Sequence, residues 1–152
     1  MDQPAPGPDQ TDAVYVGKYR ILKEWARGGM GVVYRALDED LEREVALKSP
    51  LADDASDGDR RLILKEARAA SRGSHPHVVP VYEAFEYDGR PWLAMEFING
   101  PTLRETLAAG RLSIEELLLT GEQIADALAA AHGKGVLHRD LKPGNIMMAA
   151  RG

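Results

Sequence analysis

The sequence has no cysteine in 152 residues, which excludes both a disulfide framework and a zinc site made of thiolates. It also lacks an excess of positive charge, because its 19 lysines and arginines are outnumbered by 24 acidic residues. Proteins that bind nucleic acids concentrate basic side chains on one face, so no nucleic-acid partner is expected. No apolar run is long enough to cross a bilayer, and the proline-rich start lacks the basic and apolar regions of a secretory signal. We therefore expect a cytoplasmic protein with no membrane segment in this chain.

What is present is the composition of one ordinary globular domain, with 44% apolar and 28% charged residues. Residues 1–17 are the exception. They are rich in proline and carry too little apolar surface to fold alone, so we expect them to form a disordered tail. The remainder divides by pattern into a strand-rich part, residues 18–97, and a helical part, residues 98–152. The expected fold class is α+β.

Alternating and β-branched residues predict five strands in the first part, joined by turns rich in glycine and aspartate. The predicted strands are 19–25, 32–37, 44–48, 78–87 and 91–97. Between the third and the fourth of them, residues 59–72 are rich in Arg, Leu, Lys, Glu and Ala, which are good helix formers. The pattern therefore predicts a five-stranded antiparallel sheet with one helix.

Two capping boxes predict helix starts in the second part. Thr102 is followed by Glu105, and Ser113 by Glu116, at the spacing that lets each pair satisfy two backbone N–H groups of the first turn. The second box opens a long amphipathic helix that is expected to end near Gly133. We interpret its apolar stripe as core packing. The residues of this stripe are Leu117, Ile124, Leu128 and Ala131.

Three glycines, Gly28, Gly29 and Gly31, lie in the turn between the first two predicted strands. A hairpin tip without side chains lets backbone N–H groups approach a polyphosphate, although many surface hairpins are also rich in glycine. Lys48 ends an apolar strand, where an ammonium group is costly unless it meets a carboxylate or a phosphate. Glu66 on the predicted helix is the candidate partner. The alternative for Glu66 is an ordinary position on the helix surface.

The most informative segment is the loop His138-Arg139-Asp140-Leu141-Lys142-Pro143-Gly144-Asn145. Asp140 can accept a hydroxyl proton, and Lys142 can meet the charge that develops on a transferred phosphoryl group. Asn145 can offer a neutral oxygen to a metal ion. His138 and Arg139 are expected to hold the shape of the loop. This order of residue types predicts phosphoryl transfer rather than a merely charged loop.

These motifs together resemble the eukaryotic-like serine/threonine protein kinases in their bacterial, Hanks-type form. The resemblance runs from about Tyr19 to Met148 and rests on the glycine turn, on the strand that ends at Lys48, on the helix around Glu66 and on the loop that ends at Asn145. It implies the protein-kinase fold, with a complete N-lobe sheet and helix followed by a helical C-lobe that stops after the catalytic loop. A lysine two residues after the catalytic Asp resembles Ser/Thr rather than Tyr kinases.

The resemblance also implies that ATP and Mg²⁺ are used and that the substrate is a protein with Ser or Thr hydroxyls. Asp140 would be the catalytic base, Lys142 would contact the γ-phosphate, and Asn145 would bind one Mg²⁺. Lys48 would hold the α- and β-phosphates and pair with Glu66. The residues that would enclose the nucleotide are Ala26, Gly28, Gly29, Gly31, Val33, Ala46, Lys48, Met95, Glu96 and Ile98.

Two departures from the family pattern affect the expected activity. Ala26 stands where the family has the first glycine of its glycine motif, which predicts weakened but not abolished nucleotide binding. No Asp-Phe-Gly follows Asn145, and in the family that Asp holds the metal that bridges the phosphates. We therefore expect a truncated kinase with impaired catalysis. Its apolar helical stripe would be covered by a partner or by the missing part of the C-lobe.

Two other functions stay open at this point. One is a non-catalytic, pseudokinase-like module that binds a nucleotide or a partner, which would show ATP binding without Mg²⁺-dependent transfer. The other is a small-molecule kinase of the aminoglycoside type, which shares a His-x-Asp-x-x-x-x-Asn loop. Arg139, Lys142-Pro143 and the glycine turn argue against the second of these.

Overall fold

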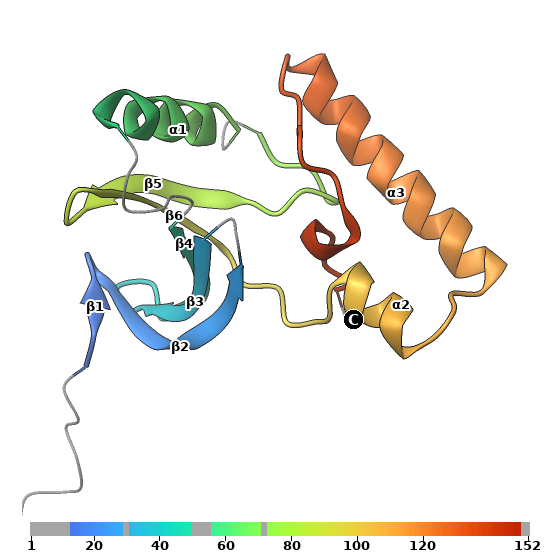
Figure 1. Cartoon of the computed structure of the whole chain (residues 1–152), viewed down its shortest axis with the longest axis horizontal. Coiled ribbons are helices and arrows are strands. Elements are labelled where there is room, and N and C mark those ends of the chain that lie inside the picture. Colours follow the sequence, from blue (N-terminus) through green and yellow to red (C-terminus); the bar gives the residue numbers. More distant parts are fainter. Residues whose placement is uncertain (1–12, 29–30, 50–55, 71–72, 150–152) are drawn as a thin grey trace, which may run out of the picture.

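The computed structural model describes residues 13–28, 31–49, 56–70 and 73–149 (Figure 1). One antiparallel sheet has the strand order β1-β2-β3-β4-β6-β5. The strands are β1 Tyr15–Val16, β2 Tyr19–Gly28, β3 Gly31–Asp38, β4 Arg43–Ser49, β5 Val81–Tyr87 and β6 Arg90–Glu96. The helices are α1 Asp57–Ala70, α2 Leu103–Ala109 and α3 Ile114–Gly133, and Pro143–Asn145 form a short 3-10 turn, η1.

The sheet has one strand more than the sequence predicted. Tyr15 and Val16 pair with Arg20 and Tyr19 of β2, and the Val16 side chain is buried in the core. The expectation of a disordered tail over residues 1–17 is therefore wrong for this pair, whereas residues 1–12 lie outside the described residues. A two-residue strand has no alternation of its own to detect, and it exists here because β2 supplies its hydrogen bonds.

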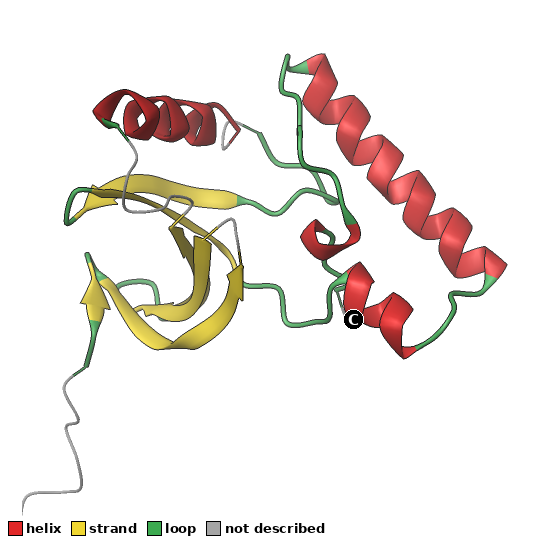
Figure 2. Cartoon of the chain, in the orientation of Figure 1, coloured by secondary structure: helices red, strands yellow, loops and turns green. Residues whose placement is uncertain are grey.

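The strands, yellow in Figure 2, form a curled sheet, and a hydrophobic core lies against it. The core consists of Val16, Tyr19, Ala36, Val45, Leu47, Trp92 and Ala94. The Tyr19 ring of β2 lies 5.6 Å from the Phe85 ring of β5, although these two strands are far apart in the strand order. Gly17 has a φ of +58°, and a Cβ there would lie 3.4 Å from Phe85. The two ends of the sheet therefore meet through aromatic side chains.

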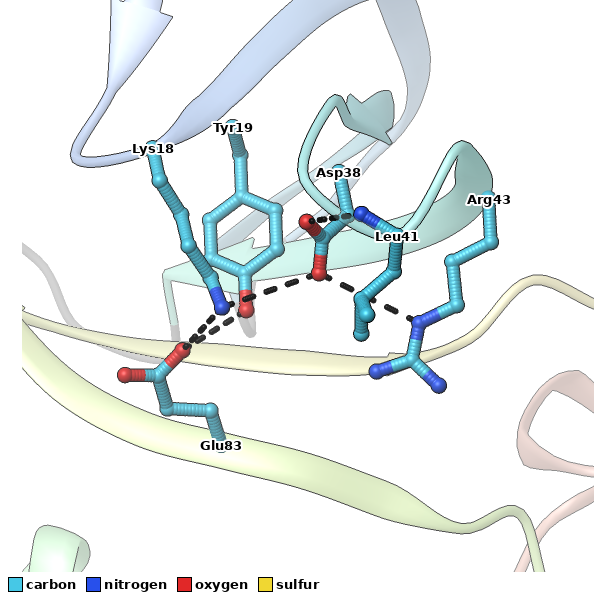
Figure 3. Close-up of polar contacts among 6 residues, drawn as sticks. All are labelled: Lys18, Tyr19, Asp38, Leu41, Arg43 and Glu83. Carbon is cyan, nitrogen blue, oxygen red and sulfur yellow. Dashed lines mark hydrogen bonds and ion pairs between the residues drawn. The ribbon is translucent and has the colours of Figure 1, made fainter.

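A polar cluster closes the same junction (Figure 3). The Tyr19 hydroxyl donates a 2.7 Å hydrogen bond to Glu83, and Lys18 lies 3.7 Å from both Glu83 and Asp38. Asp38 has no exposed surface, and the Arg43 guanidinium approaches its carboxylate to 3.9 Å. Burial, and then the hydrogen bond to Glu83, raises the pKa of the Tyr19 hydroxyl. The phenol therefore stays a neutral donor at any physiological pH.

Both predicted capping boxes are confirmed in the helical part. The Thr102 side chain accepts a hydrogen bond from the Glu105 backbone, and the Glu105 carboxylate accepts one of 2.7 Å from the Thr102 backbone. That backbone donor lowers the pKa of Glu105. Ser113 and Glu116 form the same reciprocal pair at the start of α3. The caps explain why α2 and α3 begin where they do.

The α3 helix does not bury its apolar stripe. No residue of α3 is fully buried: of the stripe, Leu117 is 59% exposed, whereas Ile124, Leu128 and Ala131 are half-buried. The interpretation of the stripe as core packing is therefore wrong for Leu117 and holds only in part for the other three residues, since α3 lies to one side of the sheet (Figure 1). Among the described helices, α3 included, none has the length and hydropathy that a membrane span requires.

Candidate active site

The glycine turn joins β2 to β3 as the sequence predicted. Gly28 and Gly31 are opposite each other at the closed end of the hairpin, and Gly31 has a φ of +112°, a conformation that side chains with a Cβ rarely adopt. A Cβ added to Gly28 would meet no atom within 4 Å, so the space over this end of β2 is open. Gly29 lies outside the described residues. The described part of the turn therefore leaves backbone groups accessible at its edge.

Strand register brings five of the predicted nucleotide-site residues onto one face of the sheet. Opposed residues of antiparallel strands share a face, as do alternate residues of one strand. Val33 of β3 is opposite both Ala26 of β2 and Lys48 of β4. Ala46, two residues before Lys48, is opposite Met95 of β6. A lysine thus lies within a largely apolar wall that spans four strands.

Lys48 is half-buried in this wall, next to Leu93 across the β4–β6 ladder. Its predicted partner Glu66 lies on α1, which packs against β5 and β6. The Glu66 side chain is outside the described part of the structure, so the Lys48–Glu66 pair stays a prediction.

The segment that follows β6 connects the sheet to α2 (Figure 1). Glu96 is the last residue of β6, and its backbone N–H donates to the Pro80 carbonyl over 3.0 Å. Ile98 lies two residues further on and is half-buried. Between them, Phe97 packs edge-to-face against Trp25 of β2, with ring centroids 4.9 Å apart. This aromatic contact was not predicted from the sequence.

The loop that ends at Asn145 brings three predicted residues into direct contact. The Lys142 ammonium lies 3.1 Å from Oδ2 of Asp140. The Asn145 Nδ2 group donates hydrogen bonds of 2.9 Å to that same oxygen and to the Asp140 backbone carbonyl. Because the amide nitrogen binds Asp140, Oδ1 is the atom that Asn145 can present to a cation.

These contacts set the charge of Asp140. The hydrogen bond from Lys142, and next that from Asn145, holds the pKa of the Asp140 carboxyl below its usual range. Asp140 is therefore ionised at neutral pH and has oxygen lone pairs for a proton or a metal ion. Its side chain is 36% exposed, so solvent weakens the ion pair with Lys142 without removing it.

The backbone of the loop holds Asp140 in place. The Asp140 N–H donates to Nδ1 of His138 over 3.2 Å, which matches the supporting role expected for that histidine. Arg139 has a φ of +62°, a left-handed conformation that is unfavourable for a residue with a side chain. Such strained residues persist where surrounding contacts fix them, and they are common at functional sites.

The loop is also anchored to the start of α2. The Leu103 N–H donates to the Ile146 carbonyl, and the Met148 N–H donates to the Pro101 carbonyl, each over 2.8 Å. A Cβ at Gly100 would collide with the Met148 carbonyl oxygen, so only glycine fits there. The sequence did not indicate this close approach.

A second connection joins the two halves of the chain. Nε2 of His75, in the loop before β5, lies 3.2 Å from Oδ2 of Asp126 on α3. The sequence analysis did not identify this contact. Within the described ranges, the structure has no group of three or more His, Asp or Glu side chains that could hold a metal ion by themselves.

Comparisons with known proteins agree with this arrangement. The sequence profile of the protein kinase domain matches residues 19–152. The probable serine/threonine-protein kinase pknA2 of Bifidobacterium longum is 40% identical over 141 residues, which are 90% of this chain and 19% of that protein. The serine/threonine-protein kinase PrkC of Bacillus subtilis is 42% identical over 134 residues, which are 87% of this chain and 21% of that protein.

Solved structures show the same fold. The crystal structure of the Mycobacterium tuberculosis PknI kinase domain superimposes with a TM-score of 0.81 at 30% identity, covering 93% of this chain and 59% of that domain. The chain therefore spans about a fifth of the curated relatives it matches and somewhat more than half of a solved kinase domain.

Proposed function

Because this chain belongs to the bacterial Hanks-type serine/threonine protein kinases and spans the N-terminal part of their catalytic domain, we propose that it binds ATP for transfer of the γ-phosphate to Ser or Thr hydroxyls of a protein. The observation that carries the proposal is the loop in which Asp140 is bound by Lys142 and Asn145. An ionised carboxylate, a lysine and an amide oxygen within one short loop suit a reaction in which a hydroxyl attacks phosphorus.

In the proposed reaction, the hydroxyl oxygen of the substrate forms a bond to the γ-phosphorus while the bond from that phosphorus to the ADP oxygen breaks. Asp140 accepts the hydroxyl proton. Its lowered pKa keeps the carboxylate ionised at neutral pH, as a proton acceptor must be. Lys142 stabilises the charge on the phosphoryl oxygens as they separate from ADP. Lys48, in the wall of the sheet, holds the phosphates in line.

The donor set fits Mg²⁺, which prefers oxygen ligands and is usually held by one or two protein groups together with substrate phosphates. Asn145 would hold the ion through Oδ1, since its nitrogen is bound to Asp140. When bound, Mg²⁺ would neutralise part of the phosphate charge. The other side-chain ligand known in the family, the Asp of Asp-Phe-Gly, does not occur in these 152 residues.

The missing Asp supports a second part of the proposal, that this chain by itself transfers phosphate poorly. Metal and dipole groups that meet developing charge contribute on the order of several kcal/mol to a transition state. A chain without that ligand keeps the sheet face that contains Lys48 and the catalytic base Asp140, but it loses part of this stabilisation.

The experiment measures ATP binding and phosphate transfer side by side. Binding of ATP with Mg²⁺ is followed by calorimetry, and transfer of labelled γ-phosphate to a protein rich in Ser and Thr is followed over hours. We expect binding and slow transfer for the natural chain, and unchanged binding with no transfer for Asp140→Asn. Equal transfer by Asp140→Asn would contradict the assigned base.

The alternative function, a non-catalytic nucleotide-binding module, makes a different prediction in the same experiment. It predicts ATP binding with no transfer by the natural chain, whether or not Mg²⁺ is present. The contacts that Lys142 and Asn145 make with Asp140 favour an active base over this alternative.

A further inference from the structure

Trp25 and Phe97 join β2 to the segment that connects the two halves of the chain. Their rings meet edge-to-face, with centroids 4.9 Å apart and planes at 85°, a preferred geometry for aromatic pairs. Trp25 lies at an irregular step in the β2–β3 ladder, between Glu24 and Ala26. Figure 1 shows the end of β2 beside the start of the connecting segment, where this contact places them. We call this pair the aromatic clasp.

Each ring of the clasp makes a cation–π contact. The Lys23 ammonium lies 4.6 Å from the centre of the Trp25 ring, and the Arg35 guanidinium lies 5.0 Å from that of Phe97. Arg35 is itself fixed by two hydrogen bonds to Glu44 of β4, of 3.0 and 2.6 Å. The contacts therefore form a continuous path from β4 through β3 to Phe97 and Trp25, and each cation favours the electron-rich face of its ring.

Core packing does not account for Trp25. Its side chain is 38% exposed and lies outside the hydrophobic core, whereas the other tryptophan, Trp92, is 8% exposed and belongs to that core. A large aromatic side chain that stays partly exposed and makes a specific ring contact is better explained by the two segments that this contact holds together.

The clasp lies between residues of the proposed nucleotide site. Ala26 directly follows Trp25 and shares a sheet face with Val33 and Lys48, while Glu96 and Ile98 flank Phe97. The resemblance to protein kinases implies that the base of ATP would lie between the end of β2 and the connecting segment, since both supply residues that would enclose the nucleotide. A contact that fixes their separation would determine how well this space is formed before the nucleotide arrives.

We propose that Trp25 and Phe97 are positioning residues that preorganise the base-binding end of the nucleotide site by fixing β2 against the connecting segment. This inference rests on the proposed function, since it assumes that ATP binds at this wall. A site that is held in its binding conformation loses less entropy when the ligand binds. The clasp also restrains the chain next to Ala26, where the family pattern has a flexible glycine.

The test compares four variants with the natural chain: Trp25→Ala, Trp25→Phe, Phe97→Ala and Tyr82→Ala. Tyr82 is the matched control, because it is also 38% exposed and has a cation, Arg43, over its ring, but it lies on β5 away from the proposed site. Calorimetry measures the affinity for ATP, for adenosine and for inorganic tripolyphosphate, and urea unfolding confirms that each variant folds.

We expect Trp25→Ala and Phe97→Ala to bind ATP and adenosine about three- to tenfold more weakly, in line with the usual strength of an aromatic pair. Tripolyphosphate binding should be unchanged, because the clasp acts on the base end. Trp25→Phe should restore ATP binding to within about twofold, since it keeps a ring against Phe97, and Tyr82→Ala should match the natural chain.

Two kinds of result would overturn the inference. The first is that the natural chain binds ATP and Trp25→Ala binds it equally well, or that Trp25→Ala loses as much affinity for tripolyphosphate as for adenosine. In either case the clasp does not position the base, and only this inference fails. An equal loss in Tyr82→Ala would likewise show a general effect of removing an exposed ring. If the natural chain binds no ATP, the proposed function fails and the role of the clasp fails with it.

Discussion

Asn145 donates hydrogen bonds from one amide nitrogen to both the carboxylate and the backbone carbonyl of Asp140, each over 2.9 Å. This double contact closes the catalytic loop on itself across five residues and leaves the amide oxygen for a cation. It ties the orientation of the proposed base to that of the proposed metal ligand. Changing either residue should therefore disturb both binding of the metal and transfer of the proton.

Lys142→Met should raise the pKa of Asp140 toward the ordinary aspartate value of about 3.9, because it removes the largest cause of the lowered pKa. The change is measured by NMR titration of the carboxyl carbon. Lys65→Met, at an exposed position of α1, is the control and should leave the pKa of Asp140 unchanged. A pKa that stays low in Lys142→Met would mean that Asn145 alone holds it there.

The sign of the effect on stability follows from the lowered pKa. Asp140 binds its proton more weakly in the folded chain than in the unfolded chain, so its ionisation stabilises the fold above the unfolded pKa. That contribution is lost as the pH falls through the folded pKa. At pH 6 the natural chain should accordingly have a higher free energy of unfolding than Lys142→Met. This difference should vanish in strong acid.

Gly100→Ala should destabilise the chain by about 1–3 kcal/mol, because the added methyl group collides with the carbonyl of Met148, the residue whose N–H docks the end of the catalytic loop on Pro101. Gly110→Ala is the matched control, since a Cβ there meets no atom within 4 Å and its backbone is extended. Urea unfolding measures both. Equal stability of the two variants would show that the loop does not dock on the start of α2 in solution.

Leu47→Ala and Leu118→Ala should differ widely in their effect on unfolding. Leu47 has no exposed surface in the core of the sheet, so its truncation should cost about 2–5 kcal/mol. Leu118 is 67% exposed on α3, and its truncation should change the free energy of unfolding by less than about 0.5 kcal/mol. A large loss in Leu118→Ala would instead indicate that the α3 face is packed in solution.

Ala26→Gly should tighten ATP binding, and Gly28→Ala should weaken it, if the backbone of this turn approaches the phosphates. The Gly28 change introduces no steric clash, since nothing lies within 4 Å of the added carbon. Its effect therefore reports on the ligand rather than on folding. Calorimetry on both variants checks the pair. An affinity that fails to improve in Ala26→Gly would show that the first glycine is dispensable here.

Local patterns were enough to predict most of the fold. Alternation and turn residues indicated β2 to β6, with ends that differ from the observed ones by a few residues, and capping boxes located the starts of α2 and α3. The helix predicted at 59–72 is observed as α1, Asp57–Ala70. These elements are specified by neighbours in the sequence, so a sequence pattern can show them.

Features that depend on distant contacts could not be predicted in this way. The strand Tyr15–Val16 depends on its pairing with β2, and the contact of His75 Nε2 with the Asp126 carboxylate depends on how α3 lies against the loop before β5. Likewise, nothing local to Trp25 indicates that Phe97 would be its neighbour. The predicted site residues came together where strand register or a short loop determines the distance, as for Lys48 and Val33.

The account depends most directly on whether this chain binds ATP through the wall that contains Lys48. The decisive measurement is a calorimetric titration of the natural chain and of Lys48→Met with ATP in the presence of Mg²⁺. We predict binding by the natural chain and a loss of about 10- to 100-fold in Lys48→Met, the usual range for hydrogen bonds to charged groups. Equal affinities for the two chains, or no binding by the natural chain, would contradict the account.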